Sequence, residues 1–181
     1  MVLREEITQE TDVKVKRGRN ALAFTIVVLL WLTFDTVTKF FFEQTQTLGD
    51  VVPGSSWGLI HFRLVHNTGA AWGMFDDSTW MLGILSLVVC AALIVYLFVL
   101  APRSSRGEAI GLALVFAGGL GNAIDRFARG YVVDFIETTF IDFPVFNIAD
   151  IGVTCGFIIF IIFLFYNEKK RGTFRGDRGD V

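Results

Sequence analysis

Carboxylates and carboxamides recur at short, regular spacings within or beside apolar stretches of this chain. Asn122 and Asp125 lie three residues apart, and Asn147 and Asp150 repeat that spacing, so each pair lies on one helix face. Asp150 belongs to an apolar segment and has no basic residue near it in the sequence. Because a charge at the bilayer centre costs about 2.5–3.5 kcal/mol even on lenient scales, such residues are candidates for function.

Two further polar groups are candidates, and each also has a structural interpretation. Asp35 and Lys39, four residues apart, can form an ion pair in which Lys39 reaches toward lipid headgroups. For Asp35 a contact with substrate is equally open. The run 67–73, which starts at Asn67 and includes Gly69, indicates either close backbone approach at a membrane surface or only a turn.

Two more groups complete the set. Asp134 lies in a predicted loop but has apolar neighbours on both sides, which is unusual for a solvated acid. The run 118–126 is rich in glycine and ends in Asp125 and Arg126. It predicts either a polar site beside closely packed helices or a helix end held by two charges.

Carboxylates and amides of this kind suit proton chemistry. Two acids in a low-dielectric site tend to share one proton, so the ionised acid can take a proton from water while the protonated acid polarises a carbonyl. That is aspartic peptide hydrolysis, although a proton or ion pathway uses the same ingredients. Spacing alone favours Asp125 paired with Asp150. No zinc motif, phosphate loop or activated Ser or Cys is apparent, and we expect no metal or cofactor.

Composition identifies the elements that must position these groups. The chain has 181 residues, of which 53% are hydrophobic, and its mean hydropathy is +0.57. These values exclude intrinsic disorder, a disulfide scaffold and a collagen-like repeat. Four stretches are long and apolar enough to cross a bilayer as helices, at about 21–42, 79–100, 109–127 and 145–166. We place the start of the fourth at Asp142-Phe143-Pro144, with the proline in its first turn.

The basic residues predict an orientation. Twelve of the sixteen Lys and Arg residues lie at the two ends or between the second and third stretches. By the positive-inside rule both termini are cytoplasmic, and the segments 43–78 and 128–143 face the other side. Alternating residues at 57–66 predict a short strand, to which 131–133 and 140–143 could add.

The expected fold is therefore a membrane all-α core of four transmembrane helices with a small extracytoplasmic β-structure from the outer loops. We divide the chain into a cytoplasmic N-terminal segment (1–20), a single four-helix membrane domain (21–167) and a cytoplasmic tail (168–181). The first stretch has no small-residue cleavage site, which indicates a retained anchor.

Together, these residues resemble the lipoprotein signal peptidases, also called signal peptidase II. Five motifs occur in the family's order over about 35–156: Asp35-x-x-x-Lys39, Asn67-x-Gly-Ala-Ala, Gly121-Asn-x-x-Asp-Arg126, Val133-Asp134-Phe135 and Phe146-Asn-x-Ala-Asp150. Each motif is weak alone, but five in order are highly specific. One departure is Trp72, where the family usually has phenylalanine.

The resemblance implies a role for each site residue. It makes Asp134 and Asp150 the catalytic pair, in place of the pairing favoured by spacing. It makes Asp125 a supporting residue, Asp35 a pocket-stabilising acid and Lys39 its helix partner. The positions that match contacts to substrate or to the inhibitor globomycin, or that line the pocket beside them, are Asn67, Gly69, Asn122, Arg126 and Asn147.

The resemblance also implies the reaction and its place. The expected enzyme is an aspartic endopeptidase of the bacterial cytoplasmic (inner) membrane, with its active site at the outer face and no cofactor. It would cleave diacylglyceryl-modified prolipoproteins just before the lipidated cysteine. Partners would be these substrates, membrane lipids and globomycin-like peptides, with no nucleic acid and the protein as a monomer. A proton- or ion-coupled transporter and a membrane scaffold are the alternative classes.

Overall fold

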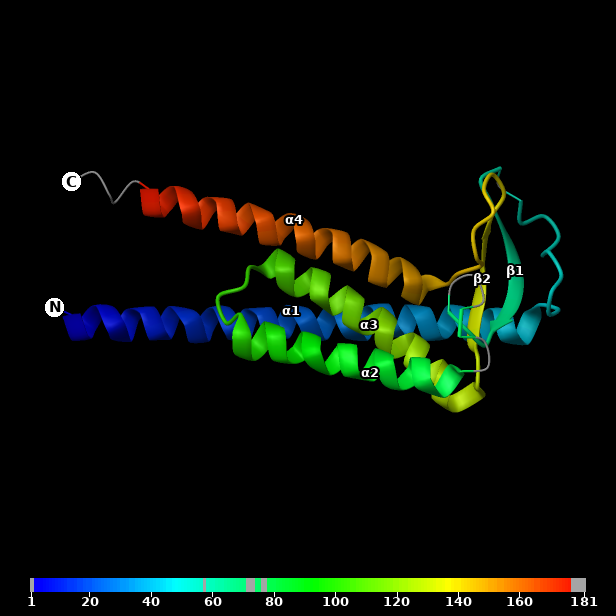
Figure 1. Cartoon of the computed structure of the whole chain (residues 1–181), viewed down its shortest axis with the longest axis horizontal. Helices are drawn as coiled ribbons and strands as arrows, with labels where there is room; N and C mark the ends of the chain where they lie inside the picture. The colour runs from blue at the N-terminus through cyan, green and yellow to red at the C-terminus, as the bar shows by residue number, and fades with distance from the viewer. Residues whose placement is uncertain (1, 57, 71–73, 76–77, 177–181) are drawn as a thin grey trace.

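Four long helices run side by side, and a two-stranded sheet lies across one end of them (Figure 1). The computed structural model describes residues 2–56, 58–70, 74–75 and 78–176. The helices are α1 (Val2–Thr45), α2 (Thr79–Val95) with its π-helical continuation η2 (Tyr96–Leu100), α3 (Arg106–Arg129) and α4 (Ile148–Gly176). The strands β1 (Ile60–Asn67) and β2 (Val132–Thr138) pair antiparallel.

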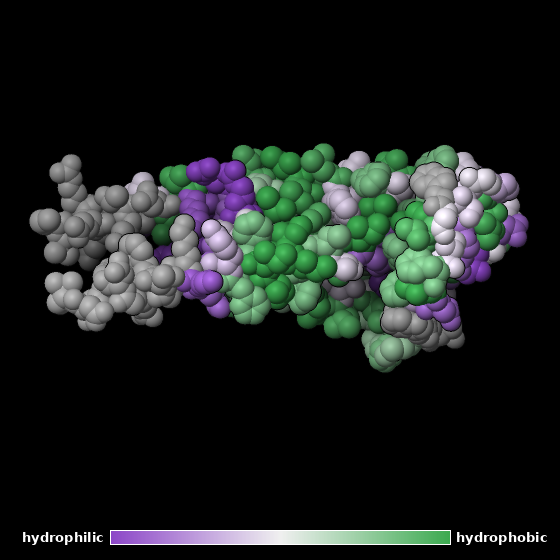
Figure 2. All heavy atoms as spheres, turned by 90° about the horizontal axis from the view of Figure 1, so that it is seen from above, coloured by the Kyte–Doolittle hydropathy of each residue, from purple (hydrophilic) through white to green (hydrophobic). Residues whose placement is uncertain are grey.

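Each of the four helices contains a stretch apolar and long enough to cross a membrane. Figure 2 shows a band of hydrophobic side chains around the middle of the molecule, with hydrophilic residues toward both ends. Large apolar side chains of the helices, such as Leu30, Phe40, Ile84 and Phe157, are exposed. A surface of that kind suits contact with lipid, and it confirms the predicted four-helix membrane core.

The helix α3 is the centre of the bundle. It packs against α1, α2 and α4, and half of its most apolar stretch is buried, compared with 11 to 22% in the other three helices. Its first turn is fixed by a capping box in which the Ser105 side chain accepts from the Glu108 N–H and the Glu108 side chain accepts from the Ser105 N–H. Its last turn ends at Gly130 in the left-handed conformation, which glycine adopts without strain.

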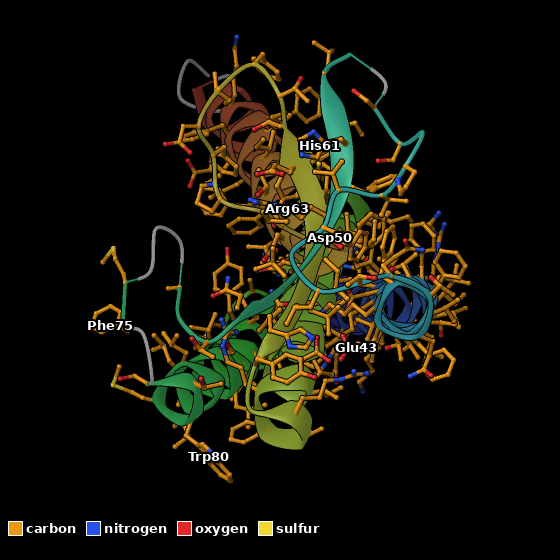
Figure 3. All side chains as sticks on the ribbon, turned by 90° about the vertical axis from the view of Figure 1, so that its right-hand side faces the viewer. Glu43, Asp50, His61, Arg63, Phe75 and Trp80 are labelled. Carbon is orange, nitrogen blue, oxygen red and sulfur yellow. The ribbon has the colours of Figure 1, made fainter. Side chains whose placement is uncertain are left out.

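The sheet covers the end of the bundle that carries the polar motifs. His61 of β1 lies opposite Glu137 of β2, and both His61 and Arg63 pair with the Glu137 carboxylate across the strands. Figure 3 looks onto this end, with His61 and Arg63 along the sheet and Glu43 at the end of α1. An apolar cluster of Phe42, Phe135 and their neighbours packs beneath the strands, where these two rings stack at 4.1 Å. The predicted small β-structure is thus confirmed.

Three boundaries differ from the sequence expectations. The helix α1 begins at Val2 rather than near residue 21, because the charged stretch before the span contains no proline and continues the helix. Residues 140–143 belong to neither strand. The start of α4 is Ile148, so the placement of Pro144 in its first turn is wrong. Phe146 instead forms backbone hydrogen bonds with Ile136 of β2, at 2.8 and 3.0 Å, which hold the preceding segment extended.

Candidate active site

The strand β2 brings Asp134 to the centre of the polar site. Side chains alternate along a strand, so Val133 and Phe135 enter the apolar cluster while Asp134 faces the other way. Asp134 is nevertheless buried, with 2% of its surface exposed. Its Oδ2 accepts a hydrogen bond from Asn67 Nδ2 at 2.9 Å, and its Oδ1 accepts one from Asn147 Nδ2 at 2.7 Å. Both carboxylate oxygens are therefore held by amide donors.

Asp150 lies in the first turn of α4, where hydrogen bonds fix its carboxylate. The Asn147 N–H donates to Asp150 Oδ2, and the Asp150 N–H donates to Asn147 Oδ1, each at 3.0 Å. This reciprocal pair is equivalent to a capping box and satisfies two donors at the helix end. Asn122 Nδ2 of α3 donates to the other oxygen, Oδ1, at 2.8 Å. The helix N-terminus also favours negative charge at this position.

Asn147 joins the two acids. Its backbone contacts Asp150, whereas its side-chain amide donates to Asp134, to Asn122 Oδ1 at 3.0 Å and to the Val133 carbonyl at 3.3 Å. It is completely buried. The backbone pairing of Phe146 with β2 places Asn147 beside Asp134, so the strand, the helix and the two acids are fixed relative to one another.

A buried ion cluster supports the site from behind. Lys39 Nζ lies 2.8 Å from Asp35 Oδ2 and 3.0 Å from Asp125 Oδ2, and it donates to Asn122 Oδ1 at 2.9 Å. Because Lys39 is only 2% exposed, it does not reach lipid headgroups, and that alternative is wrong. The predicted pairing of Asp35 with Lys39 is confirmed. The cluster thus reaches Asp150 through Asn122.

The two acids of this cluster also hold backbone groups next to the candidate dyad. Asp35 Oδ1 accepts from the Ala149 N–H at 2.9 Å, beside Asp150. Asp125 Oδ2 accepts from the Val133 N–H at 3.4 Å, beside Asp134. Both contacts lie one residue from a candidate catalytic acid, so the cluster helps to fix the backbone on each side of the site.

The loop after β1 also contributes to the site. Asn67 Oδ1 accepts from the Gly69 N–H at 3.0 Å, which turns the chain, and the Gly69 carbonyl accepts from Arg126 Nη2 at 3.2 Å. Arg126 is buried and directs its positive charge toward Asp134 and Asp150. Glycine at 69 thus participates through its backbone.

These groups surround a cavity of about 320 Å³. Its polar wall contains both candidate acids together with Asn67, Asn122 and Arg126. The other lining residues are mostly apolar and consist of Ala70, Val132 and the run 143–146. A cavity lined by a few convergent polar groups and by apolar side chains is typical of a substrate site.

The electrostatics of the cavity favour proton sharing. Burial, together with the neighbouring charge of Asp150, raises the pKa of Asp134 to about 8, although hydrogen bonds from Asn67 and Asn147 act in the opposite direction. Asp134 therefore retains its proton at neutral pH. One protonated and one ionised carboxyl group on the same cavity can act as acid and base.

Comparison with known proteins identifies the family. Residues 27–166 match the family model described as Signal peptidase (SPase) II. The chain belongs to the signal peptidase II family. The matched range contains all ten site residues predicted from the sequence, and the family's description indicates a peptidase.

Relatives and solved structures agree with this membership. The lipoprotein signal peptidase of Microcystis aeruginosa is 38% identical over 148 residues, which cover 81% of this chain and 94% of the relative. That of Nostoc punctiforme is 37% identical over 161 residues, covering 89% and 99%. A bacterial membrane enzyme solved by the in meso method at 2.3 Å superposes with a TM-score of 0.70 at 34% identity, covering 84% of this chain and 91% of that one.

The ten predicted site residues all belong to the network of hydrogen bonds and ion pairs around the cavity. The sequence analysis missed other residues that line the cavity. The run Phe143-Pro144-Val145-Phe146 forms one wall, whereas its proline had indicated a helix start. The extended preference of the residue before proline was the available signal. Trp72, the departure from the family pattern, lies outside the described residues.

Proposed function

We propose that this member of the signal peptidase II family is an intramembrane aspartic endopeptidase that removes signal peptides from diacylglyceryl-modified bacterial prolipoproteins. Cleavage falls just before the lipidated cysteine. The observation that carries the proposal is the joint anchoring of Asp134 and Asp150 by Asn147 at one cavity. Relatives named lipoprotein signal peptidase supply the substrate class.

The proposed mechanism divides the work between the two acids. Asp150 takes a proton from a water molecule, which adds to the carbonyl carbon of the scissile peptide bond. Asp134, protonated at neutral pH, donates to the carbonyl oxygen. The resulting tetrahedral intermediate collapses, the carbon–nitrogen bond breaks, and the amine leaves with the proton that Asp150 had taken. Asp134 recovers its own proton as the carbonyl re-forms.

The other site residues bind or position. Asn67, Gly69, Asn122, Arg126 and Asn147 are the proposed binding and pocket residues, because they line the cavity or hold its acids. The buried Nε of Arg126 has no hydrogen-bond partner among the described residues, which suits a substrate carbonyl. The Asp35, Lys39 and Asp125 cluster supports them and does not itself line the cavity.

The same proposal includes an orientation in the bacterial cytoplasmic membrane. Both termini are cytoplasmic, with 1–20 and 168–181 flanking the membrane domain 21–167, and the cavity opens at the outer face. The basic residues at the two ends and in the loop before α3 support the cytoplasmic position of the termini, by the positive-inside rule. A lipidated substrate can then keep its acyl chains in the bilayer while its peptide enters the cavity.

Two properties accompany the proposed function. Globomycin-like peptides bind in the same cavity and inhibit cleavage. The active unit is a monomer, since one chain supplies both acids and every group that holds them.

Cleavage of defined substrates tests the proposal. The purified protein in detergent is incubated with a diacylglyceryl-modified prolipoprotein and with the same protein before lipidation, and products are followed by gel shift and mass spectrometry. We expect a single cut before the cysteine in the lipidated form alone. Equal cleavage of both forms would reject the lipid requirement, and no cleavage by a folded protein would reject the function.

A further inference from the structure

A second cavity lies between α1 and the start of α3. Figure 1 shows that α3 starts on the side of the bundle away from the sheet. It has a volume of about 400 Å³, and the described residues that line it are Val15, Lys16, Arg19, Asn20 and Arg106. Three of these five carry a positive charge and none carries a negative charge. We refer to it as the basic cavity.

Hydrogen bonds between α1 and the loop before α3 fix the shape of the basic cavity. Asn20 is buried, and its Nδ2 donates to the Ser104 carbonyl at 2.8 Å. Lys16 Nζ donates to the Arg103 carbonyl at 3.0 Å. These contacts hold the residues of α1 against the start of α3 without using the charges of Arg19 or Arg106.

No described acidic side chain forms an ion pair with the positive charges that line the basic cavity. Among the described side chains, the ion pairs involve neither Arg19 nor Arg106. Arg19, Arg106 and Lys16 are exposed, so a ligand can reach them. Arginine presents a planar fork of donors that matches the oxygens of a phosphate group.

The cavity also lies at the boundary of the apolar surface. The apolar part of α1 begins directly after Asn20, and Leu22 and Ile26 on it are 63% and 47% exposed. Figure 2 shows hydrophilic side chains next to the hydrophobic band at this end. A ligand with an anionic head and apolar chains fits both surfaces at once.

We propose that the basic cavity binds the phosphate headgroup of an anionic phospholipid whose acyl chains lie along the exposed face of α1. A zwitterionic headgroup adds a positive charge beside three others, so anionic lipids are preferred. The site is separate from the dyad and serves to anchor the ends of α1 and α3 to the headgroup layer of the bilayer.

Native mass spectrometry of the intact protein in detergent tests this proposal. Phosphatidylglycerol and phosphatidylcholine with the same acyl chains are added in turn to the wild type, to Arg19→Gln/Arg106→Gln and to the control Lys14→Gln/Arg17→Gln. Both variants lose two charges at the same end, but the control residues do not line the cavity. Glycerol 3-phosphate and inorganic phosphate are the soluble competitors.

We expect one retained phosphatidylglycerol on the wild type and on the control, and affinity lower by about tenfold or more in Arg19→Gln/Arg106→Gln. Equal losses in both variants, or no preference for phosphatidylglycerol in the wild type, would overturn the site. Competition by inorganic phosphate at the affinity of the lipid would show a free-anion site instead. If the double variant does not elute as a folded species, Arg106→Gln alone replaces it and must show the same loss of lipid.

Discussion

Asn147 is the residue on which the geometry of the candidate dyad depends most. A single buried amide donates to Asp134 and Asn122 through its side chain and exchanges backbone-to-side-chain hydrogen bonds with Asp150. Aspartate at this position would place a third carboxylate beside two others, and alanine would remove the side-chain amide that donates to Asp134 Oδ1. Asparagine supplies both a donor and an acceptor without a charge.

The raised pKa of Asp134 predicts a pH dependence of stability. Between about pH 4 and pH 8 the unfolded chain loses this proton while the folded protein keeps it, so the wild type loses stability as pH rises through this window. Asp134→Asn has no such proton. We expect the Tm of the variant minus that of the wild type to increase from pH 4 to pH 8, measured by thermal unfolding in detergent.

A matched variant controls for effects that do not come from the buried position of Asp134. Asp50→Asn makes the same chemical change at an exposed position between α1 and β1 and controls for net charge and detergent. A Tm difference for Asp134→Asn that is constant or decreasing over the same pH range would contradict protonation of Asp134 in the folded protein.

The buried Lys39 side chain gives a second prediction, about the stability of the folded protein. Lys39→Met leaves Asp35 and Asp125 as buried carboxylates without their shared cation, which costs about 3–5 kcal/mol of stability. The measurement is denaturant or thermal unfolding, and Lys39→Met/Asp35→Asn should recover part of the loss. The control Lys14→Met breaks an exposed pair with Glu10 and should not change Tm. A Lys39→Met variant as stable as the wild type would contradict the role of the cluster.

Residue types and motifs were sufficient to predict which side chains belong together, but not their backbone partners. The Ala149 N–H that binds Asp35 and the Gly69 carbonyl that binds Arg126 come from positions without a polar side chain. Spacing alone also favoured Asp125 with Asp150, whereas Asp125 instead binds Lys39 behind the cavity. The backbone partners and the pairing of Asp125 both depend on contacts between residues far apart in the chain, and residue spacing does not predict such contacts.

At the scale of elements, glycines set the distance between α3 and α4. A Cβ added at Gly111 would lie 2.6 Å from the Phe160 nitrogen and 2.7 Å from the Gly156 carbonyl oxygen, both in the backbone of α4. Gly156 faces Gly111 in return, while Gly152 accommodates the Trp31 ring of α1. The small residues Gly152 and Gly156 of α4 therefore allow contact with two different helices.

This close approach predicts a cost for any side chain at Gly111. Gly111→Ala must move two backbones apart and should destabilise the protein by about 1–3 kcal/mol. Gly18→Ala in α1 is the control, because its Cβ meets nothing within 4 Å and alanine favours a helix by roughly 0.5–1 kcal/mol. Thermal unfolding of both variants measures the difference. Equal Tm values for the two would contradict close helix contact at Gly111.

The start of α4 shows where local signals were insufficient. Proline is favoured in a first helical turn, and Pro144 lies at the edge of the apolar run, so the sequence predicted a start near it. The structure begins the helix at Ile148 because backbone bonds to β2 and the reciprocal contacts of Asn147 outweigh that preference. The misplaced residues instead form a wall of the cavity.

For the whole molecule, hydropathy predicted the four spans well, since about twenty apolar residues per helix is a constraint of the bilayer itself. The helix boundaries beyond the bilayer were less predictable, and α1 extends to Val2.

The charge asymmetry further predicts one orientation. In a Cys90→Ala/Cys155→Ala background, Asp50→Cys should react with a membrane-impermeant thiol reagent on intact spheroplasts, and Arg103→Cys only after lysis. The reverse pattern would place the cavity on the cytoplasmic side.

The most direct test of the proposed mechanism compares three isosteric variants on the lipidated prolipoprotein. Asp134→Asn and Asp150→Asn each remove an acid from the cavity, whereas Asp125→Asn alters an acid that binds Lys39 behind it. We predict that cleavage falls by about 10²–10⁴-fold or more in the first two, with folded protein retained, and remains measurable in the third. Cleavage that persists in Asp134→Asn but is lost in Asp125→Asn would contradict the Asp134–Asp150 dyad.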